Sequence, residues 1–225
     1  MSQAAAARHV RRAVEIPTDQ GVLNGDLREP PEPRGVIVFA HGSGSSRFST
    51  RNRQVAESLD RRGFATLLLD LLTALEEAVD LRTNEYRFDI ERLGARVTAA
   101  VDWTTSRPGL RDLPIGCFGA STGAAAALMA AAARADRVAV VVSRGGRPDL
   151  AHTALPRVTA PTLLIVGGED ASVIEMNREA MRQMTGAHVE LRIIPRATHL
   201  FEEPGALEQV ERLAGEWFAR YLVSR

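Results

Sequence analysis

The sequence predicts an α/β fold, a doubly wound and mostly parallel sheet flanked by helices. Apolar runs without alternation recur along the chain, which is typical of strands covered on both faces. Segments with apolar residues three or four positions apart lie between these runs, as helices require. Strands that alternate with helices form crossover units, and such units build a doubly wound sheet.

The first expected strands form a hairpin, because Asp19-Gln20-Gly21 supplies turn residues between β-type segments at His9–Ile16 and Val22–Arg28. Prolines then interrupt the backbone before the first long apolar run. The later strands are expected at Gly35–Ala40, Ala65–Leu69, Ile115–Phe118, Val138–Val142, Thr162–Val166 and Val189–Ile194.

Helical spacing predicts helices at Arg51–Arg62, Ile90–Thr105, Gly123–Arg134, Glu175–Met184 and Ala206–Leu222. The stretch Leu71–Phe88 is the least regular, and we expect a solvated connection there, with a short lid as the alternative. No repeat or linker divides the chain. Its 225 residues are about one and a half typical domain lengths, so residues 1–225 are expected to form a single domain without a large cap.

Composition excludes several classes of function. The 28 basic and 28 acidic residues balance, which argues against nucleic acid as a partner. Every basic residue is arginine, which excludes a Schiff-base or Walker lysine, and the lone Cys117 excludes a disulfide framework or a cysteine zinc cluster. The N-terminus lacks a secretory core, and no run approaches the ~18 apolar residues of a membrane span. We therefore expect a cytoplasmic protein without metal or cofactor.

The most specific motif is Gly119-Ala120-Ser121-Thr122-Gly123, between the strand Pro114–Phe118 and an alanine-rich helix. A G-x-S-x-G sequence in this context is a nucleophile elbow, which lifts the serine hydroxyl above the sheet. The glycines are needed because side chains at a turn this sharp would clash with neighbouring backbone. The alternative is a glycine-rich turn whose serine only caps the next helix.

A serine nucleophile needs a base, and the base needs an orienting carboxylate. His199 and Asp170 each follow a later predicted strand, in the chain order Ser, Asp, His that this elbow demands. Both loops lie at strand carboxyl ends, where open α/β sheets bind ligands. Glu169 is the nearest competitor for the acid. The remaining candidates are Glu202, Glu203 and, as a variant orienter, Asp70.

The loop His41-Gly42-Ser43-Gly44 follows the first long strand and can turn backbone amides toward the reaction centre. We assign the Ser43 and Thr122 amides to an oxyanion hole, with Gly44 as an alternative to Ser43. His41 is expected to shape this loop and not to act as the base. The other histidines, at positions 9, 152 and 188, are expected to be structural or to face solvent.

Two arginines follow strand ends and are candidates for substrate binding: Arg47, after the oxyanion loop, and Arg144. An arginine fork there would favour a carboxylate or phosphate on the substrate. The alternative, which we weight more heavily, is that such arginines pair with Asp70, Asp149 or nearby glutamates and hold the loops in place.

Together, the elbow at Ser121, the Asp170 and His199 loops and the HGSGS segment resemble the α/β-hydrolase superfamily, over about Val14 to Leu222. The compact length is similar to the dienelactone-hydrolase-like branch. That branch is best known for a cysteine nucleophile, whereas this chain has Ser121, and Cys117 lies within the strand.

The resemblance implies a serine hydrolase that cleaves a small ester or lactone, with an anionic substrate as one option, through an acyl-serine intermediate. The alternatives are acyl transfer or perhydrolysis by the same triad, and a non-catalytic protein that binds a ligand or partner. The oligomeric state is open between monomer and homodimer. The aromatic stripe of the last helix, which includes Trp217 and Phe218, is expected to pack in the core.

Overall fold

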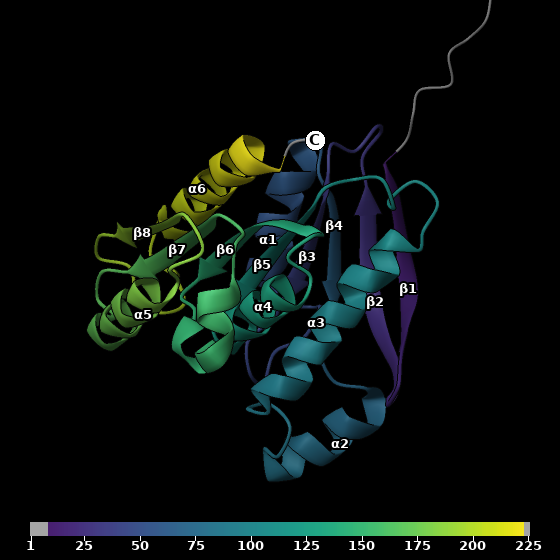
Figure 1. The fold of residues 1–225 in the computed structure, drawn as a ribbon, viewed down its shortest axis with the longest axis horizontal. Coiled ribbons are helices and arrows are strands. Elements are labelled where there is room, and N and C mark those ends of the chain that lie inside the picture. The colour runs from purple at the N-terminus through teal and green to yellow at the C-terminus, as the bar shows by residue number, and fades with distance from the viewer. Residues whose placement is uncertain (1–8, 223–225) are drawn as a thin grey trace, which may run out of the picture.

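The computed structural model describes residues 9–222, which form one eight-stranded sheet with helices on both faces (Figure 1). The strand order is β1-β2-β4-β3-β5-β6-β7-β8. Pairs β1–β2 and β2–β4 are antiparallel, and every later pair is parallel. The predicted fold class is therefore confirmed. The expectation about a secretory signal concerns an N-terminus that lies partly outside the described residues.

The strands are short and, apart from the hairpin and β8, buried along their length, which explains their continuous apolar sequences. Each predicted strand is present, and the hairpin pairs from Val10–Glu29 to Thr18–Gly21. The strands are β1 (Val10–Thr18), β2 (Gly21–Glu29), β3 (Val36–Ala40), β4 (Ala65–Leu69), β5 (Ile115–Ala120), β6 (Val138–Arg144), β7 (Thr162–Gly167) and β8 (Val189–Ile194).

Helices α1 (Thr50–Arg61) and α6 (Ala206–Tyr221) cover one face of the sheet. Helices α3 (Ile90–Thr105), α4 (Thr122–Ala133) and α5 (Ala171–Gln183) lie on the other (Figure 1). Trp217 and Phe218 of α6 are 5% and 0% exposed, so this stripe packs in the core as expected. The two faces enclose separate apolar clusters because the sheet divides them.

The stretch Leu71–Phe88, for which we expect a solvated connection, contains helix α2 (Ala74–Thr83), which the sequence analysis does not predict. A capping box starts the helix: the Thr73 hydroxyl accepts the Glu76 amide, and the Glu76 carboxylate accepts the Thr73 amide. The helix buries only Asp80 and lies at the lower edge of the molecule in Figure 1. A second unpredicted element is a 3-10 helical segment, η1 (Pro148–Arg157).

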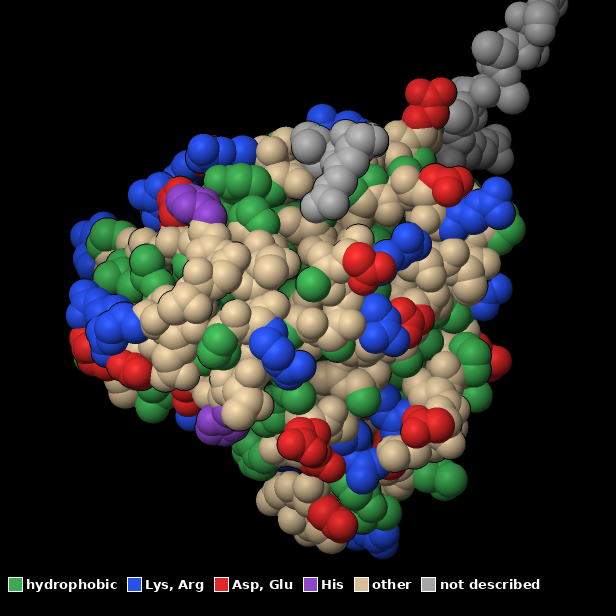
Figure 2. All heavy atoms as spheres, in the orientation of Figure 1, with side chains coloured by type: hydrophobic (Ala, Val, Ile, Leu, Met, Phe, Trp, Pro, Cys, Tyr) green, Lys and Arg blue, Asp and Glu red, His purple; other side chains and the backbone are tan. Residues whose placement is uncertain are grey.

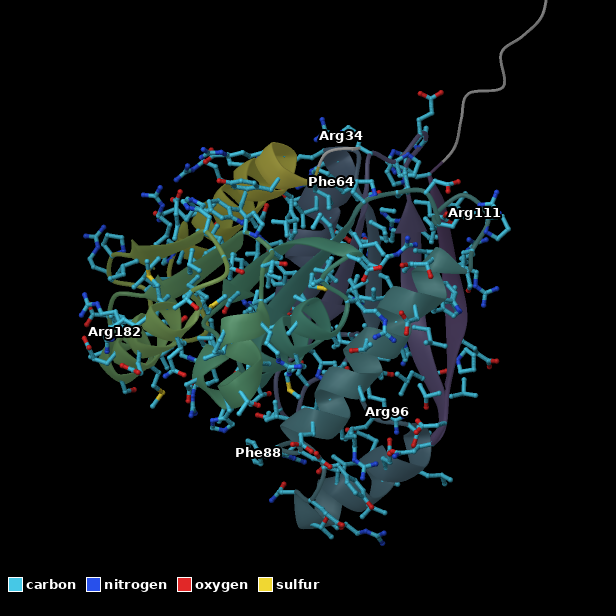
Figure 3. The ribbon with its side chains drawn as sticks, viewed as in Figure 1. Arg34, Phe64, Phe88, Arg96, Arg111 and Arg182 are labelled. Carbon is cyan, nitrogen blue, oxygen red and sulfur yellow. The ribbon has the colours of Figure 1, made fainter. Side chains whose placement is uncertain are left out.

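An ion-pair cluster joins α2 to α3 and the hairpin. Arg96 of α3, labelled in Figure 3, donates to Glu76 at 2.8 Å and to the Thr18 hydroxyl of the hairpin. Arg92 also donates to Glu76, at 2.7 Å. Burial alone would raise the pKa of Glu76, but the Thr73 amide and the arginine charges lower it below 4.5. Because Glu76 lies in the first turn of α2, this cluster holds the N-terminal end of the helix against α3 and the hairpin.

The surface shows no dominant charge. Figure 2 shows acidic and basic side chains interspersed over the visible face, which agrees with their equal numbers in the sequence. Within residues 9–222, no helix is long and apolar enough to cross a membrane.

Candidate active site

Ser121 stands on a strained turn between β5 and α4. Its backbone angles, φ 51° and ψ −125°, lie in a region that a residue with a side chain rarely adopts. Three backbone hydrogen bonds hold the turn: the Ser121 amide donates to Arg144 O at 3.2 Å, and the amides of Ala124 and Arg147 each donate to Ser121 O at 3.0 Å. The Ser121 side chain makes no helix-capping bond. Its hydroxyl is therefore not used as the cap that the alternative interpretation requires.

The flanking glycines are needed for close backbone approach. A Cβ atom at Gly119 would lie 2.4 Å from Ala124 Cα, and one at Gly123 would lie 2.3 Å from Ala40 O. Both neighbours are backbone atoms that cannot move cheaply. A side chain on either glycine would clash with neighbouring backbone, as we expect for a turn this sharp, and at Gly123 the backbone of α4 lies directly against the end of β3.

His199 and Asp170 meet at the carboxyl edge of the sheet. Asp170 Oδ2 accepts a hydrogen bond from His199 Nδ1 at 2.7 Å, and the two side chains are 15% and 38% exposed. Asp170 occupies the N-cap position of α5, yet its side chain caps no amide. Its carboxylate is thus turned to the histidine, which leaves Nε2 of His199 as the free ring nitrogen.

Within residues 9–222, the other acids considered as partners of His199 form no hydrogen bond with its ring. Glu169 is exposed and makes no side-chain hydrogen bond within residues 9–222. Glu202 pairs with Arg51 at 2.9 Å. Asp70 accepts the Arg47 amide at 2.8 Å and pairs with the Arg47 guanidinium, so it orients no histidine.

Gly145 links the elbow to His199. It directly follows Arg144, whose carbonyl accepts the Ser121 amide. A Cβ atom at Gly145 would lie 3.1 Å from His199 O and 3.7 Å from the ring atom Cε1. The imidazole therefore packs over the backbone next to Ser121. No hydrogen bond joins Ser121 Oγ to His199 in the described part of the chain.

One of the two predicted oxyanion amides, that of Ser43, binds the side chain of the other residue. The Ser43 amide donates to the Thr122 hydroxyl at 2.9 Å, which turns this amide toward the elbow. The Thr122 amide, at the first position of α4, has no acceptor among residues 9–222. The Gly44 amide likewise has none there. A bound oxyanion would have to replace the Thr122 hydroxyl on Ser43 or use Gly44 instead.

His41 has the structural role that the sequence predicts. Its Nε2 atom accepts the Leu71 amide at 3.1 Å, so Nδ1 carries the proton and donates to Gly42 O at 2.8 Å. Burial lowers the pKa of His41 below 6.5. A neutral imidazole with both nitrogens occupied ties the His41–Gly44 loop to the end of β4 and is not free to act as a base.

The two candidate arginines differ in their surroundings. Arg47 pairs with Asp70, lies 3.5 Å from the Asp26 carboxylate and packs over the Phe48 ring. These contacts favour the loop-fixing alternative for Arg47. Arg144 is 8% exposed and forms no ion pair with any described residue.

Arg87 is a further polar group that the sequence pattern did not reveal. Its Nε atom donates to the buried Asp80 at 2.7 Å. A Cβ atom at Gly44 would lie 3.3 Å from Arg87 Nη1, so this nitrogen covers the His41–Gly44 loop. Gly44 and Arg87 line a small pocket together with Leu72 and Glu77. The sequence does contain a clue, the opposite charges of Asp80 and Arg87. Predicting helix α2 would have been needed to place this pair beside the loop.

Comparison with known proteins places this arrangement in a family. A family model for the dienelactone hydrolase family matches residues 23–221. The chain belongs to the dienelactone hydrolase family. A dienelactone hydrolase from Anabaena variabilis has a crystal structure that aligns with a TM-score of 0.93 and 56% identity, over 95% of this chain and 99% of that one. Family and fold together support a hydrolase.

Two provisionally named phosphoribosyl transferases, from two strains of Mycobacterium tuberculosis, are 56% identical over 198 residues. The match covers 88% of this chain but 44% of the relatives, so the chain spans less than half of their length. The structure of Est1E from Butyrivibrio proteoclasticus aligns with a TM-score of 0.75 at 20% identity, over 92% of this chain and 98% of that one, and shows the shared fold alone.

Cys117 of this dienelactone hydrolase family member lies inside β5, four residues before Ser121, and is fully buried. Burial raises the pKa of its thiol to about 12, so it stays protonated at neutral pH. It has the apolar packing role that the sequence predicts. Within the described residues, no group of three or more His, Cys, Asp or Glu side chains could hold a metal ion.

Proposed function

We propose that this dienelactone hydrolase family member is a serine hydrolase that cleaves a small carboxylic ester or lactone. The observation that carries the proposal is the 2.7 Å bond from His199 Nδ1 to an Asp170 carboxylate that caps no amide, beside the strained elbow of Ser121. A carboxylate held this way fixes the imidazole tautomer with its Nε2 lone pair available to a serine hydroxyl.

In the proposed mechanism, His199 Nε2 takes the proton of Ser121 as Oγ attacks the acyl carbonyl. Asp170 stabilises the imidazolium that forms. The amides of Thr122 and of Ser43, or Gly44 in its place, donate to the oxyanion. His199 then protonates the leaving alcohol, and a water that His199 deprotonates releases the acid from the acyl-serine. No step needs a metal or cofactor.

The test compares the wild type with Ser121→Ala in the hydrolysis of p-nitrophenyl acetate and butyrate. A fluorophosphonate probe, followed by peptide mapping, locates the reactive residue. We expect turnover to disappear in the variant and the adduct to sit on Ser121. Ser106→Ala is the matched control, because Ser106 is an exposed residue after α3 and donates only to Trp103 O.

Other outcomes would redirect the proposal. An adduct on Ser121 without hydrolysis, but with acyl transfer to an added alcohol or peroxide, would favour the transferase or perhydrolase alternative. Folded wild-type protein that shows neither adduct nor turnover would overturn the hydrolase and favour a binding protein. An adduct on another residue would show that the elbow serine is not the nucleophile.

A further inference from the structure

Arg144 is a buried cation without a counter-charge. It ends β6, where its carbonyl accepts the Ser121 amide, so its backbone touches the elbow. The side chain is 8% exposed, and its Nε and Nη1 atoms are fully buried without an acceptor among residues 9–222. An unpaired buried charge is costly, and proteins normally pair it or hydrogen-bond it.

Comparable arginines in this protein are paired. Arg96, 2% exposed, donates to Glu76, and Arg87 donates to the buried Asp80. Arg144 departs from this pattern although it lies at the edge of the sheet where the candidate active site is. Strand alternation turns its side chain to the same face as Val140 and Val142, which is the face covered by α1 and α6.

A second guanidinium borders the same region. Arg51, in the first turn of α1, also has a buried Nε without an acceptor in the described chain, while its Nη1 donates to Glu202 at 2.9 Å. Glu202 follows Phe201, whose ring lies 3.2 Å from a Cβ built on Gly145. Arg51 and Arg144 thus flank the same His199–Glu202 segment. The charge of Arg51 adds to burial in lowering the pKa of Arg144 to about 10, so the cations repel one another.

We propose that Arg144 and Arg51 form a subsite for a phosphate group on the substrate, next to the Ser121 elbow. The two residues offer three donor nitrogens without an acceptor in the described chain, Arg144 Nε and Nη1 and Arg51 Nε, while Arg51 keeps its ion pair with Glu202 through Nη1. A carboxylate would be satisfied by the Nε–Nη edge of one guanidinium. A phosphate monoester carries about −1.5 to −2 charges at pH 7, more than a carboxylate, and three acceptor oxygens, one for each of the three donor nitrogens.

This inference rests on the proposed function and narrows its substrate to a phosphorylated ester or lactone. The carbonyl would lie at Ser121, and the phosphate would lie beneath the His199 loop, between β6 and the start of α1. The N-terminus of α1 also favours an anion at this place. The phosphate takes no part in bond breaking, so neutral esters remain substrates without this contact.

Binding is tested without catalysis, by thermal unfolding with inorganic phosphate against acetate and chloride at equal ionic strength. We expect phosphate to raise the Tm of the wild type, and of Ser121→Ala, by about 3 °C at ten times its Kd. Acetate should have no such effect. Arg144→Met should lose the phosphate response and yet unfold at a higher temperature than the phosphate-free wild type, because the uncompensated charge is gone.

Kinetics then place the subsite in the reaction. With p-nitrophenyl butyrate carrying a terminal phosphate, Arg144→Met should lower kcat/KM roughly 10- to 100-fold, the effect of losing charge-assisted hydrogen bonds. Unmodified p-nitrophenyl butyrate should change less than about 3-fold. Arg51→Gln should weaken phosphate binding, whereas the control Arg61→Gln, which removes a charge from the far end of α1, should not.

Two results would overturn the subsite. An equal Tm rise with acetate would show a general carboxylate site, and no rise with phosphate in the wild type would show a structural arginine. The wild-type titration decides this even if Arg144→Met does not fold. Phosphate binding that persists in a protein without esterase activity would keep the subsite and reject the proposed hydrolase instead.

Discussion

The substitution Asp170→Asn isolates the carboxylate that we assign to orient His199. It removes one interaction, because Asp170 Oδ2 accepts His199 Nδ1 at 2.7 Å and caps no helix amide. An Asn amide nitrogen turned to the ring would donate instead of accept, which favours the tautomer protonated at Nε2. That tautomer presents a proton, not a lone pair, to Ser121. We expect kcat to fall about 10⁴-fold, which is about 5.5 kcal/mol of barrier.

The assay is p-nitrophenyl butyrate hydrolysis at saturating substrate, with thermal unfolding measured on the same samples. Glu169→Gln is the matched control: it makes the same change of charge one residue away, on an exposed side chain without a hydrogen bond in the described structure. We expect it to keep kcat within about 2-fold. The reasoning fails if Asp170→Asn keeps more than a tenth of wild-type kcat at an unchanged Tm. It also fails if Glu169→Gln loses as much as Asp170→Asn.

Three further predictions concern the frame around the site. Glu76→Gln should reduce the free energy of unfolding by about 3 kcal/mol at pH 7, because it leaves the buried Arg96 without its carboxylate, and Glu91→Gln should not. The Glu76 pKa is lowered from 4.5, so this contribution is lost as the pH falls through the folded value, and urea unfolding of both proteins should converge in acid. Cys117 should resist Ellman's reagent at pH 8 until the protein unfolds, and a native thiol that reacts at once would contradict its position in β5. Burial raises the pKa of this thiol from 9.0 to about 12. The stability that comes from keeping the thiol protonated in the folded protein is therefore lost as the pH rises through that range. Gly123→Ala should abolish activity and lower the Tm, because its Cβ would lie 2.3 Å from Ala40 O; an active and stable variant would show that α4 can shift away from β3.

The strands could be predicted from sequence because the sheet buries them on both faces. Residues on both faces of β3, β4, β5 and β7 are buried, so these strands are apolar throughout, and their apolar runs mark their positions in the sequence. Helix α2 could not be found in the same way. Its Leu75 and Leu81 are 82% and 69% exposed, and it buries only Asp80, so it has no apolar stripe facing a core. Its capping box, Thr73 with Glu76, was the readable signal.

The site residues were predictable for a topological reason. Neighbouring parallel strands place their following loops at one edge, so Ser121, Asp170 and His199 are expected together even though they lie far apart in the sequence. Contacts between side chains of different loops were not predictable in this way. The bond from the Ser43 amide to the Thr122 hydroxyl depends on how closely α4 approaches the oxyanion loop. Gly123 permits that approach, but the sequence does not specify its distance.

The contrast between Arg144 and Arg147 shows how a small error at a strand end changes a functional interpretation. The apolar run of β6 stops at Val142, and on that basis both arginines belong to a loop, where each could reach an acid. Arg147 does lie outside the strand, and it pairs with Asp149 at 2.8 Å. The strand, however, continues to Arg144, because its backbone still pairs with β5 and β7. Strand alternation then turns its side chain toward the α1 face, away from Asp149, and leaves it without the counter-charge that we propose a phosphate group supplies.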